Sequence, residues 1–379
     1  MILLPEIRTN LLKVINFIIL FDLVFGGSGR VIVIGGISLR TMLFGFVVLI
    51  TVVYRFINES HFETTMFLMI AYFILYLVIN VLFVGNEPFG IKFDFLSRYL
   101  YLIMVFFYEI YFMHFGVENT VAEIRSMFEI LTFVFALFSI LLWMYALTLG
   151  YAAYGLIEMR FFRPYVYGSF DFIGPGLPRI FMKSSIFLPV GLMFHLDHLI
   201  DKRTVLNLFR CMVYAIAIIT TFTSGFFLAT AVCCLILFQR KHILSGSSSL
   251  FFIVLIGAGI FIISRSGLIS LMLNRYTGDY TTSYRMIQLS SIIREFMKKP
   301  LLGHGFGHEF TTFYGNTVRT TSGFEIAYGE TLVDTGIIGF SLYISIIILA
   351  IKRLMSYAKK YWICILLMGK QWPYMLNQN

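Results

Sequence analysis

Long apolar stretches recur along the whole chain, and most of them are long enough to cross a membrane. A helix needs roughly 20 mostly apolar residues to span about 30 Å of hydrocarbon. Such stretches lie near 11–27, 31–54, 64–84, 95–115, 127–147, 180–196, 204–222, 224–239, 249–264, 335–351 and 361–376. With 59% hydrophobic and 13% charged residues, the composition also differs from that of a soluble domain. We predict an all-α, polytopic integral membrane protein with ten or eleven transmembrane helices.

Basic residues in the short connections predict the orientation of the chain. With the N-terminus inside, roughly twelve Lys and Arg residues lie in short cytoplasmic segments, against three outside: Arg30, Lys92 and Arg98. The N-terminus is therefore expected in the cytoplasm. This arrangement gives nine helices over 1–264 with an outer loop at 148–179, a large periplasmic loop over 265–334, and one or two C-terminal helices over 335–379.

The loop 265–334 divides by charge and contains one helical pattern. Residues 265–300 hold six basic and two acidic residues, whereas residues 301–334 hold one basic and four acidic residues. Within the basic half, 283–299 has helical spacing and Pro300 ends it. The spacing predicts a helix along the membrane surface. Its apolar residues are Met286, Ile287, Leu289, Ile292, Ile293 and Phe296.

A basic half beside an acidic half suits chemistry on a lipid diphosphate. Arginine binds phosphate oxygens with a planar fork, and a carboxylate or histidine accepts the proton of an attacking hydroxyl. A solvated loop of mixed charge would have the same composition. Basic residues are scattered rather than clustered, so nucleic acid is not an expected partner.

The segment 298–310 (KKPLLGHGFGHEF) places His304 and His308 four residues apart. On a helix this spacing would suit zinc, but Gly303, Gly305 and Gly307 argue against a helix, so no metal site is predicted. The histidines are candidates for acid–base chemistry or ordinary loop residues. The chain has no phosphate loop ending in Lys-Ser or Lys-Thr, and no Asp-x-Asp pair. No cofactor is expected, and any donor substrate must already be activated.

Two segments in the last third resemble a known membrane family. Residues 283–307 (SYRMIQLSSIIREFMKKPLLGHGFG) are similar to the arginine, amphipathic helix, Lys-Pro-Leu and Gly-x-Gly-x-Gly series of the O-antigen polymerase/ligase family. This family includes the Wzy-type polysaccharide polymerases. Residues 325–340 (EIAYGETLVDTGIIGF) are similar to its closing motif. The pattern of spans and outer loops extends the resemblance over most of the chain.

The resemblance implies a type C glycosyltransferase fold in the bacterial inner membrane. The enzyme would join oligosaccharide repeat units carried on undecaprenyl diphosphate at the periplasmic face, without metal or nucleotide. Membrane lipid, a flippase and a chain-length regulator would be its partners. Arginines would bind the diphosphate: Arg285 first, then Arg275, Arg265 and Arg319. Acid–base chemistry or acceptor positioning would fall to Glu325, Glu330, His304 and His308.

Two other functions stay open. A ligase would transfer the glycan to a lipid acceptor, but family ligases carry a His-Asn pair where this chain has Glu325 and Ile326. A transporter would need only the spans and ionisable residues within them, such as Asp22, Glu109 and Arg210. The concentration of charge in the outer loops favours the polymerase.

Overall fold

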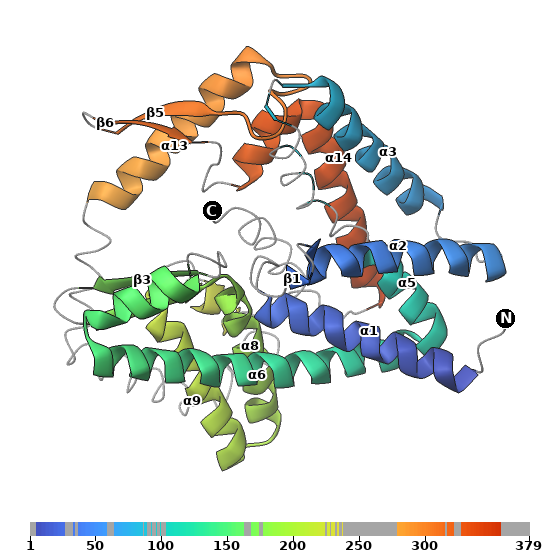
Figure 1. Ribbon diagram of the computed structural model, residues 1–379. Helices are drawn as coiled ribbons and strands as arrows, with labels where there is room; N and C mark the ends of the chain where they lie inside the picture. Colours follow the sequence, from blue (N-terminus) through green and yellow to red (C-terminus); the bar gives the residue numbers. More distant parts are fainter. Residues whose placement is uncertain are drawn as a thin grey trace. The chain divides into compact units, whose positions relative to one another are not determined.

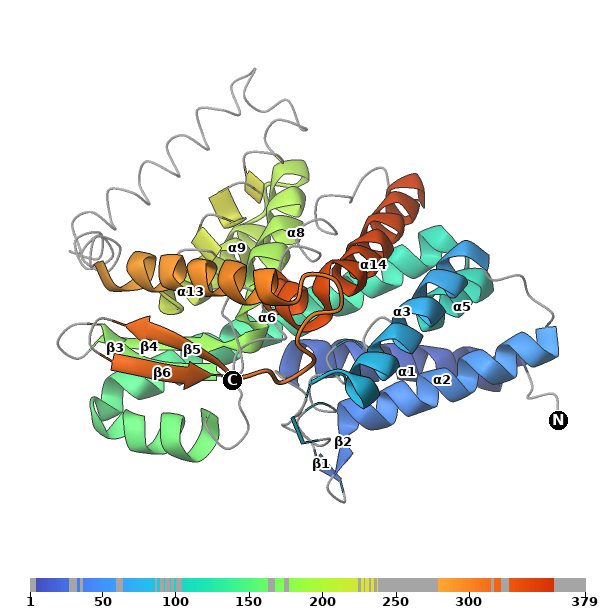
Figure 2. The same cartoon turned by 90° about the horizontal axis from the view of Figure 1, so that it is seen from above.

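The chain is mostly helical and forms two compact units (Figure 1 and Figure 2). The computed structural model describes residues 5–26, 33–34, 37–58, 64–85, 87–88, 92, 96, 99, 104–162, 168–173, 177–223, 226–227, 229–231, 233–234, 237, 279–314, 317–321 and 327–357. The first unit comprises Met1–Val14, Ile32–Glu123 and Thr282–Asn379, and the second comprises Ile15–Val31 and Ile124–Thr281.

The helices and strands have the following bounds in chain order. The α-helices are α1 (Pro5–Phe25), α2 (Leu39–Asn58), α3 (Thr64–Phe83), α5 (Met104–Phe115), α6 (Val117–Leu149), α8 (Leu188–Asp201), α9 (Val205–Thr220), α13 (Asp279–Lys298) and α14 (Ala327–Tyr357). A π-helix η2 (Tyr154–Phe162) and a 3-10 helix η3 (Lys183–Phe187) are also present. The strands are β1 (Val33–Ile34), β2 (Ile37–Ser38), β3 (Gly168–Ile173), β4 (Leu177–Met182), β5 (Phe310–Tyr314) and β6 (Thr317–Thr321).

Two helices are long and apolar enough to cross a membrane. They are Glu118–Leu149 within α6 and Tyr328–Leu349 within α14, among the residues that the structure describes. Shorter apolar helical stretches occur at Leu39–Ile50, Leu68–Phe83 and Val205–Thr220. By length and composition the chain is suited to membrane association. The predicted spans at 249–264 and 361–376, and half of 224–239, lie outside the described residues.

The strands are a departure from the all-α prediction, which is wrong in this respect. Three antiparallel pairs form, β1–β2, β3–β4 and β5–β6. The predicted helix over 31–54 begins only at Leu39, because β1 and β2 precede it. The predicted span over 180–196 starts as β4 and η3, and its helix begins at Leu188 with Pro189 in the first turn.

In the second unit, α8 and α9 pack against each other and β3 pairs with β4. The Thr204 side chain accepts a hydrogen bond from the Asn207 backbone N–H at 3.2 Å and so caps α9. Arg179 on β4 pairs with Asp171 on β3 at 3.1 Å, and its Nε donates to the Thr221 carbonyl at 3.0 Å. These bonds attach the strand pair to the end of α9.

In the first unit, α3 packs against α14, and α13 packs against β5 and the start of α14. The Phe73 ring on α3 stacks on Tyr343 of α14 with centroids 5.8 Å apart. Tyr76 donates a hydrogen bond to the Thr335 carbonyl at 2.6 Å. Ile292 of α13, Phe310 of β5 and Val333 of α14 form a buried core cluster. These contacts place α13 over the first turns of α14.

Candidate functional site

Helix α13 has its polarity reversed relative to an ordinary surface helix. Its buried face is mainly polar, and its exposed face carries large apolar side chains. The buried residues are Gln288, Ser291, Ile292 and Glu295. The exposed apolar residues are Met286, Leu289, Ile293 and Met297, between 41% and 70% exposed. The apolar set predicted for one face is therefore divided, since Ile292 and Phe296 join the core.

The loop after α13 turns at three glycines, in a backbone conformation that only glycine adopts easily. Gly303, Gly305 and Gly307 have φ values of 75°, 92° and 78°, in the left-handed region. A Cβ on Gly305 would lie 2.7 Å from the Val84 carbonyl oxygen, and one on Gly303 would collide with the Asp334 carbonyl. The prediction that 303–307 does not form a helix is confirmed.

Backbone and side-chain bonds hold this loop against α3 and α14. The His304 N–H donates to the Val333 carbonyl at 2.9 Å, and the Gly305 N–H donates to the Asp334 carbonyl at 3.0 Å. The amide of Asn80 on α3 donates to the Leu302 and Asp334 carbonyls, both at 3.3 Å. These bonds attach the loop to both helices.

Lys92 closes the C-terminal end of α3 beside this loop. Its buried ammonium donates to the carbonyl oxygens of Val81, Val84 and Gly85 at 3.3, 2.9 and 2.8 Å. These carbonyls have no partner within the helix, and a cation at a helix C-terminus satisfies them. A Cβ on Gly85 would lie 2.8 Å from the His304 carbonyl oxygen, so this end of α3 contacts the loop closely.

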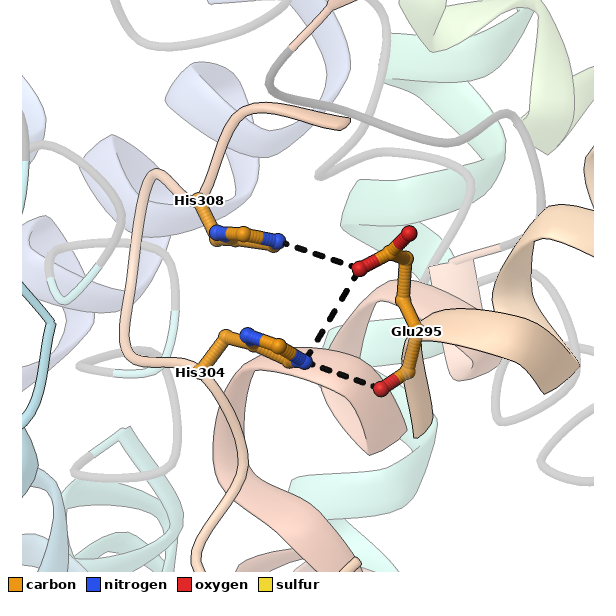
Figure 3. A group of neighbouring side chains, drawn as sticks. All are labelled: Glu295, His304 and His308. Carbon is orange, nitrogen blue, oxygen red and sulfur yellow. Dashed lines mark hydrogen bonds and ion pairs between the residues drawn. The ribbon is translucent and has the colours of Figure 1, made fainter. Parts of the chain in front are cut away.

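The loop brings His304 and His308 onto Glu295, on the buried face of α13 (Figure 3). The His304 Nε2 donates to the Glu295 backbone carbonyl at 2.8 Å and lies 4.0 Å from its Oε2. The His308 Nε2 lies 3.5 Å from the same Oε2. The two imidazoles stack with centroids 4.1 Å apart and planes at 15°. One carboxylate therefore faces two parallel imidazoles.

Burial and neighbouring charges set the ionisation of this cluster. Burial opposes the charge on Glu295, but its bonds to Lys298 and its proximity to His308 outweigh burial, and the pKa of the carboxyl lies below its usual value. Burial lowers the pKa of His304, and the hydrogen bond to the Glu295 carbonyl offsets only part of this. At neutral pH the cluster holds a carboxylate and a neutral His304 imidazole.

The predicted site residues divide into those that the structure describes and those outside its described ranges. His304 and His308 meet at Glu295, as above. Glu330 is buried in the first turn of α14. Arg285 lies on α13, and Arg319 lies on β6 opposite Thr312. Arg265, Arg275 and Glu325 fall outside the described residues.

Sequence reasoning missed the importance of Glu295. It counted this residue only in the charge of the loop, whereas the structure places it at the centre of the histidine cluster. One signal was present: Glu295 falls four residues after Ser291 and three before Lys298, on the polar side of the helix. The glycines exclude a helical histidine pair, but the loop brings these two histidines together without a helix.

Comparisons with known proteins add no relative. No protein-family model matches the chain, and no curated protein or solved structure shows significant similarity to it.

Proposed function

We propose that this chain is a membrane glycosyltransferase, a Wzy-type polymerase that joins oligosaccharide repeat units carried on undecaprenyl diphosphate. The observation that carries the proposal is the reversed polarity of α13. Apolar side chains on the outside and polar ones on the inside suit a helix that lies between lipid and a polar site. A lipid-linked sugar diphosphate has the same division, since its prenyl chain stays in the bilayer and its head group lies at the surface.

The residues that flank the exposed stripe support a lipid neighbour. Arg294 and Lys298 have side chains 49% and 57% exposed at the edge of the stripe, and Lys299 is exposed at its end. Basic side chains beside an apolar stripe bind anionic head groups. In this orientation Met286, Leu289 and Ile293 enter the acyl region.

Helix α6, in the second unit, supports membrane residence independently. It has a continuous exposed stripe of large apolar residues at the three- and four-residue spacing of one helix face: Ile130, Val134, Leu137, Leu141 and Met144. Ile130 is 62% and Leu141 is 65% exposed. Such a stripe is costly in water and favourable against lipid.

The diphosphate is assigned to Arg285 and the acid–base role to Glu330. Arg285 lies on α13, seven residues before Ile292 of the core cluster, and it is the arginine of the segment that resembles the family motif. A departing diphosphate gains negative charge, which a fixed guanidinium stabilises. Glu330 lies one helical turn before Asp334, whose carbonyl accepts from the Gly305 N–H of the histidine loop. A carboxylate there would accept the proton of an acceptor hydroxyl.

The deciding experiment combines a deletion with reconstitution. Deletion of the gene should leave surface glycan limited to one repeat unit, and the purified protein in liposomes should form a ladder from undecaprenyl-diphosphate-linked repeat units. Unattached polymer in the deletion strain would indicate a ligase instead. Wild-type chain lengths would contradict both and favour the transporter.

Topology is tested separately. Reporter fusions near Tyr276 and Gly315 should both be periplasmic, because lipid-linked repeat units meet a polymerase on that side. A cytoplasmic result at either position would contradict the proposed site.

A further inference from the structure

We propose that Glu295, His304 and His308 form a zinc site that ties the loop 299–308 to α13. Each residue offers one ligand atom, and these atoms all lie within 4.8 Å of one another. Two imidazoles and a carboxylate are a common zinc ligand set, with water in the fourth position. The inference goes beyond the proposed function, because glycosyl transfer from a diphosphate needs no metal. It reassigns both histidines from acid–base candidates to ligands.

The separations within the cluster suit an ion better than direct hydrogen bonds. Ligands at about 2.0–2.2 Å in a tetrahedral site lie roughly 3.4 Å from each other. The distance from His308 Nε2 to Glu295 Oε2 is 3.5 Å, long for a hydrogen bond but suited to two ligands of one ion. His304 Nε2 lies 4.0 Å from the same oxygen, so its ring would need to approach by about 0.6 Å to reach the tetrahedral separation.

The metal must replace two existing interactions. Lys298 donates to both Glu295 carboxylate oxygens at 2.8 Å; its own side chain is 57% exposed, whereas that of Glu295 is 7% exposed, so the ammonium can be released to water when a cation takes its place. His304 Nε2 also exchanges its hydrogen bond to the Glu295 carbonyl for the metal bond. Because the two rings stack with planes at 15°, the imidazoles must also rotate until both Nε2 lone pairs point at the shared ion.

The surroundings supply rigidity and access. The left-handed glycines and the bonds to Val333 and Asp334 fix the backbone of the loop, so only the ligand side chains must rearrange. The His308 side chain is 26% exposed, so the cluster lies close to the surface. The loop follows α13 at the proposed membrane surface, and a metal there would hold the loop closed against the helix.

Zinc binding to the purified protein tests the proposal without any glycan substrate. The full-length chain, purified in detergent without a polyhistidine tag and stripped with a chelator, is titrated with Zn²⁺. We expect one zinc per chain and a higher unfolding temperature. His308→Gln and Glu295→Gln should each weaken binding at least about tenfold. His198→Gln, a matched change in the other unit, should leave affinity unchanged.

The zinc affinity of the Lys298→Met variant is the most specific test of the site. The substitution frees the carboxylate and should tighten zinc binding several-fold, whereas a nonspecific surface site would not respond. No stoichiometric zinc, or equal affinity in the wild type and His308→Gln, would overturn the proposal. A variant of the buried His304 is not needed, because substitution of the partly exposed His308 already removes one ligand of the proposed site. Failure of the polymerase proposal would leave these binding results unaffected.

Discussion

The imidazole rings of His304 and His308 stack face to face, with centroids 4.1 Å apart and planes 15° apart. The two histidines are four positions apart, as in one helical turn, yet the chain between them is a loop. Left-handed glycines and bonds to α14 carbonyls produce this arrangement. The backbone of the loop, rather than a helix, therefore sets the position of both rings.

Gly305→Ala should destabilise the protein by about 1–3 kcal/mol. Alanine is strained at a φ of 92°, and its Cβ would lie 2.7 Å from the Val84 carbonyl oxygen. Gly116→Ala is the matched control, because Gly116 has a φ of 75° but no atom within 4 Å of an added Cβ. It carries only the conformational cost, about 1–2 kcal/mol. Thermal unfolding in detergent measures the stability of both variants. Equal losses of stability would show that the close approach of residue 305 to Val84 adds no further cost.

Arg285→Lys should lose most polymerase activity although it keeps the charge. A guanidinium fork binds diphosphate oxygens with two donors, and the loss of one such contact raises the barrier by roughly 2–4 kcal/mol. Glycan laddering at matched expression is the measurement. Lys299→Arg and Lys298→Arg should change little, since Lys299 is exposed and arginine at 298 retains the ion pair with Glu295. Normal laddering by Arg285→Lys would move the diphosphate role to Arg275 or Arg319.

The exposed stripe of α13 should contact acyl chains. In a protein whose four cysteines are replaced by serine, a bimane label on Ile293→Cys should be quenched by lipids with a nitroxide deep in the chain. The same label on Arg294→Cys should be quenched less, because Arg294 lies about 100° around the helix from Ile293, at the edge of the stripe. Equal quenching at both positions would contradict the lipid-facing orientation.

Glu129→Gln should destabilise the second unit by about 1–3 kcal/mol. Its Oε1 lies 2.6 Å from Arg125 Nε and 3.3 Å from His198 Nε2, and its side chain is only 15% exposed. Glu123→Gln is the control, because Glu123 lies 4.0 Å from Lys13 and that lysine is 46% exposed. The control should change stability by less than about 0.5 kcal/mol. Similar unfolding temperatures for the two variants would show that the contacts of Glu129 with Arg125 and His198 do not stabilise the protein.

The local sequence pattern was sufficient to predict several of the helices. The helix predicted over 283–299 is α13, Asp279–Lys298, and the stretch 64–84 is α3, Thr64–Phe83. Pro300 removes a backbone donor after α13, and alternating glycines exclude a helix over 303–307; both effects act within a few residues. Strands β1, β2 and β4 were missed because a short apolar run suits a helix and a strand alike, whereas β3, β5 and β6 lie in segments that were predicted as outer loops.

The sequence by itself determined which residues of α13 share a face, because the helical period is a local property. The tertiary structure alone decided that Gln288, Ser291 and Glu295 face inward while Met286 and Met297 face outward. It also decided that two loop histidines meet Glu295, since their positions depend on carbonyls of Val333 and Asp334 about 30 residues further along the chain. Contacts over such a distance leave no periodic trace in the sequence, so only folding brings these ligands together.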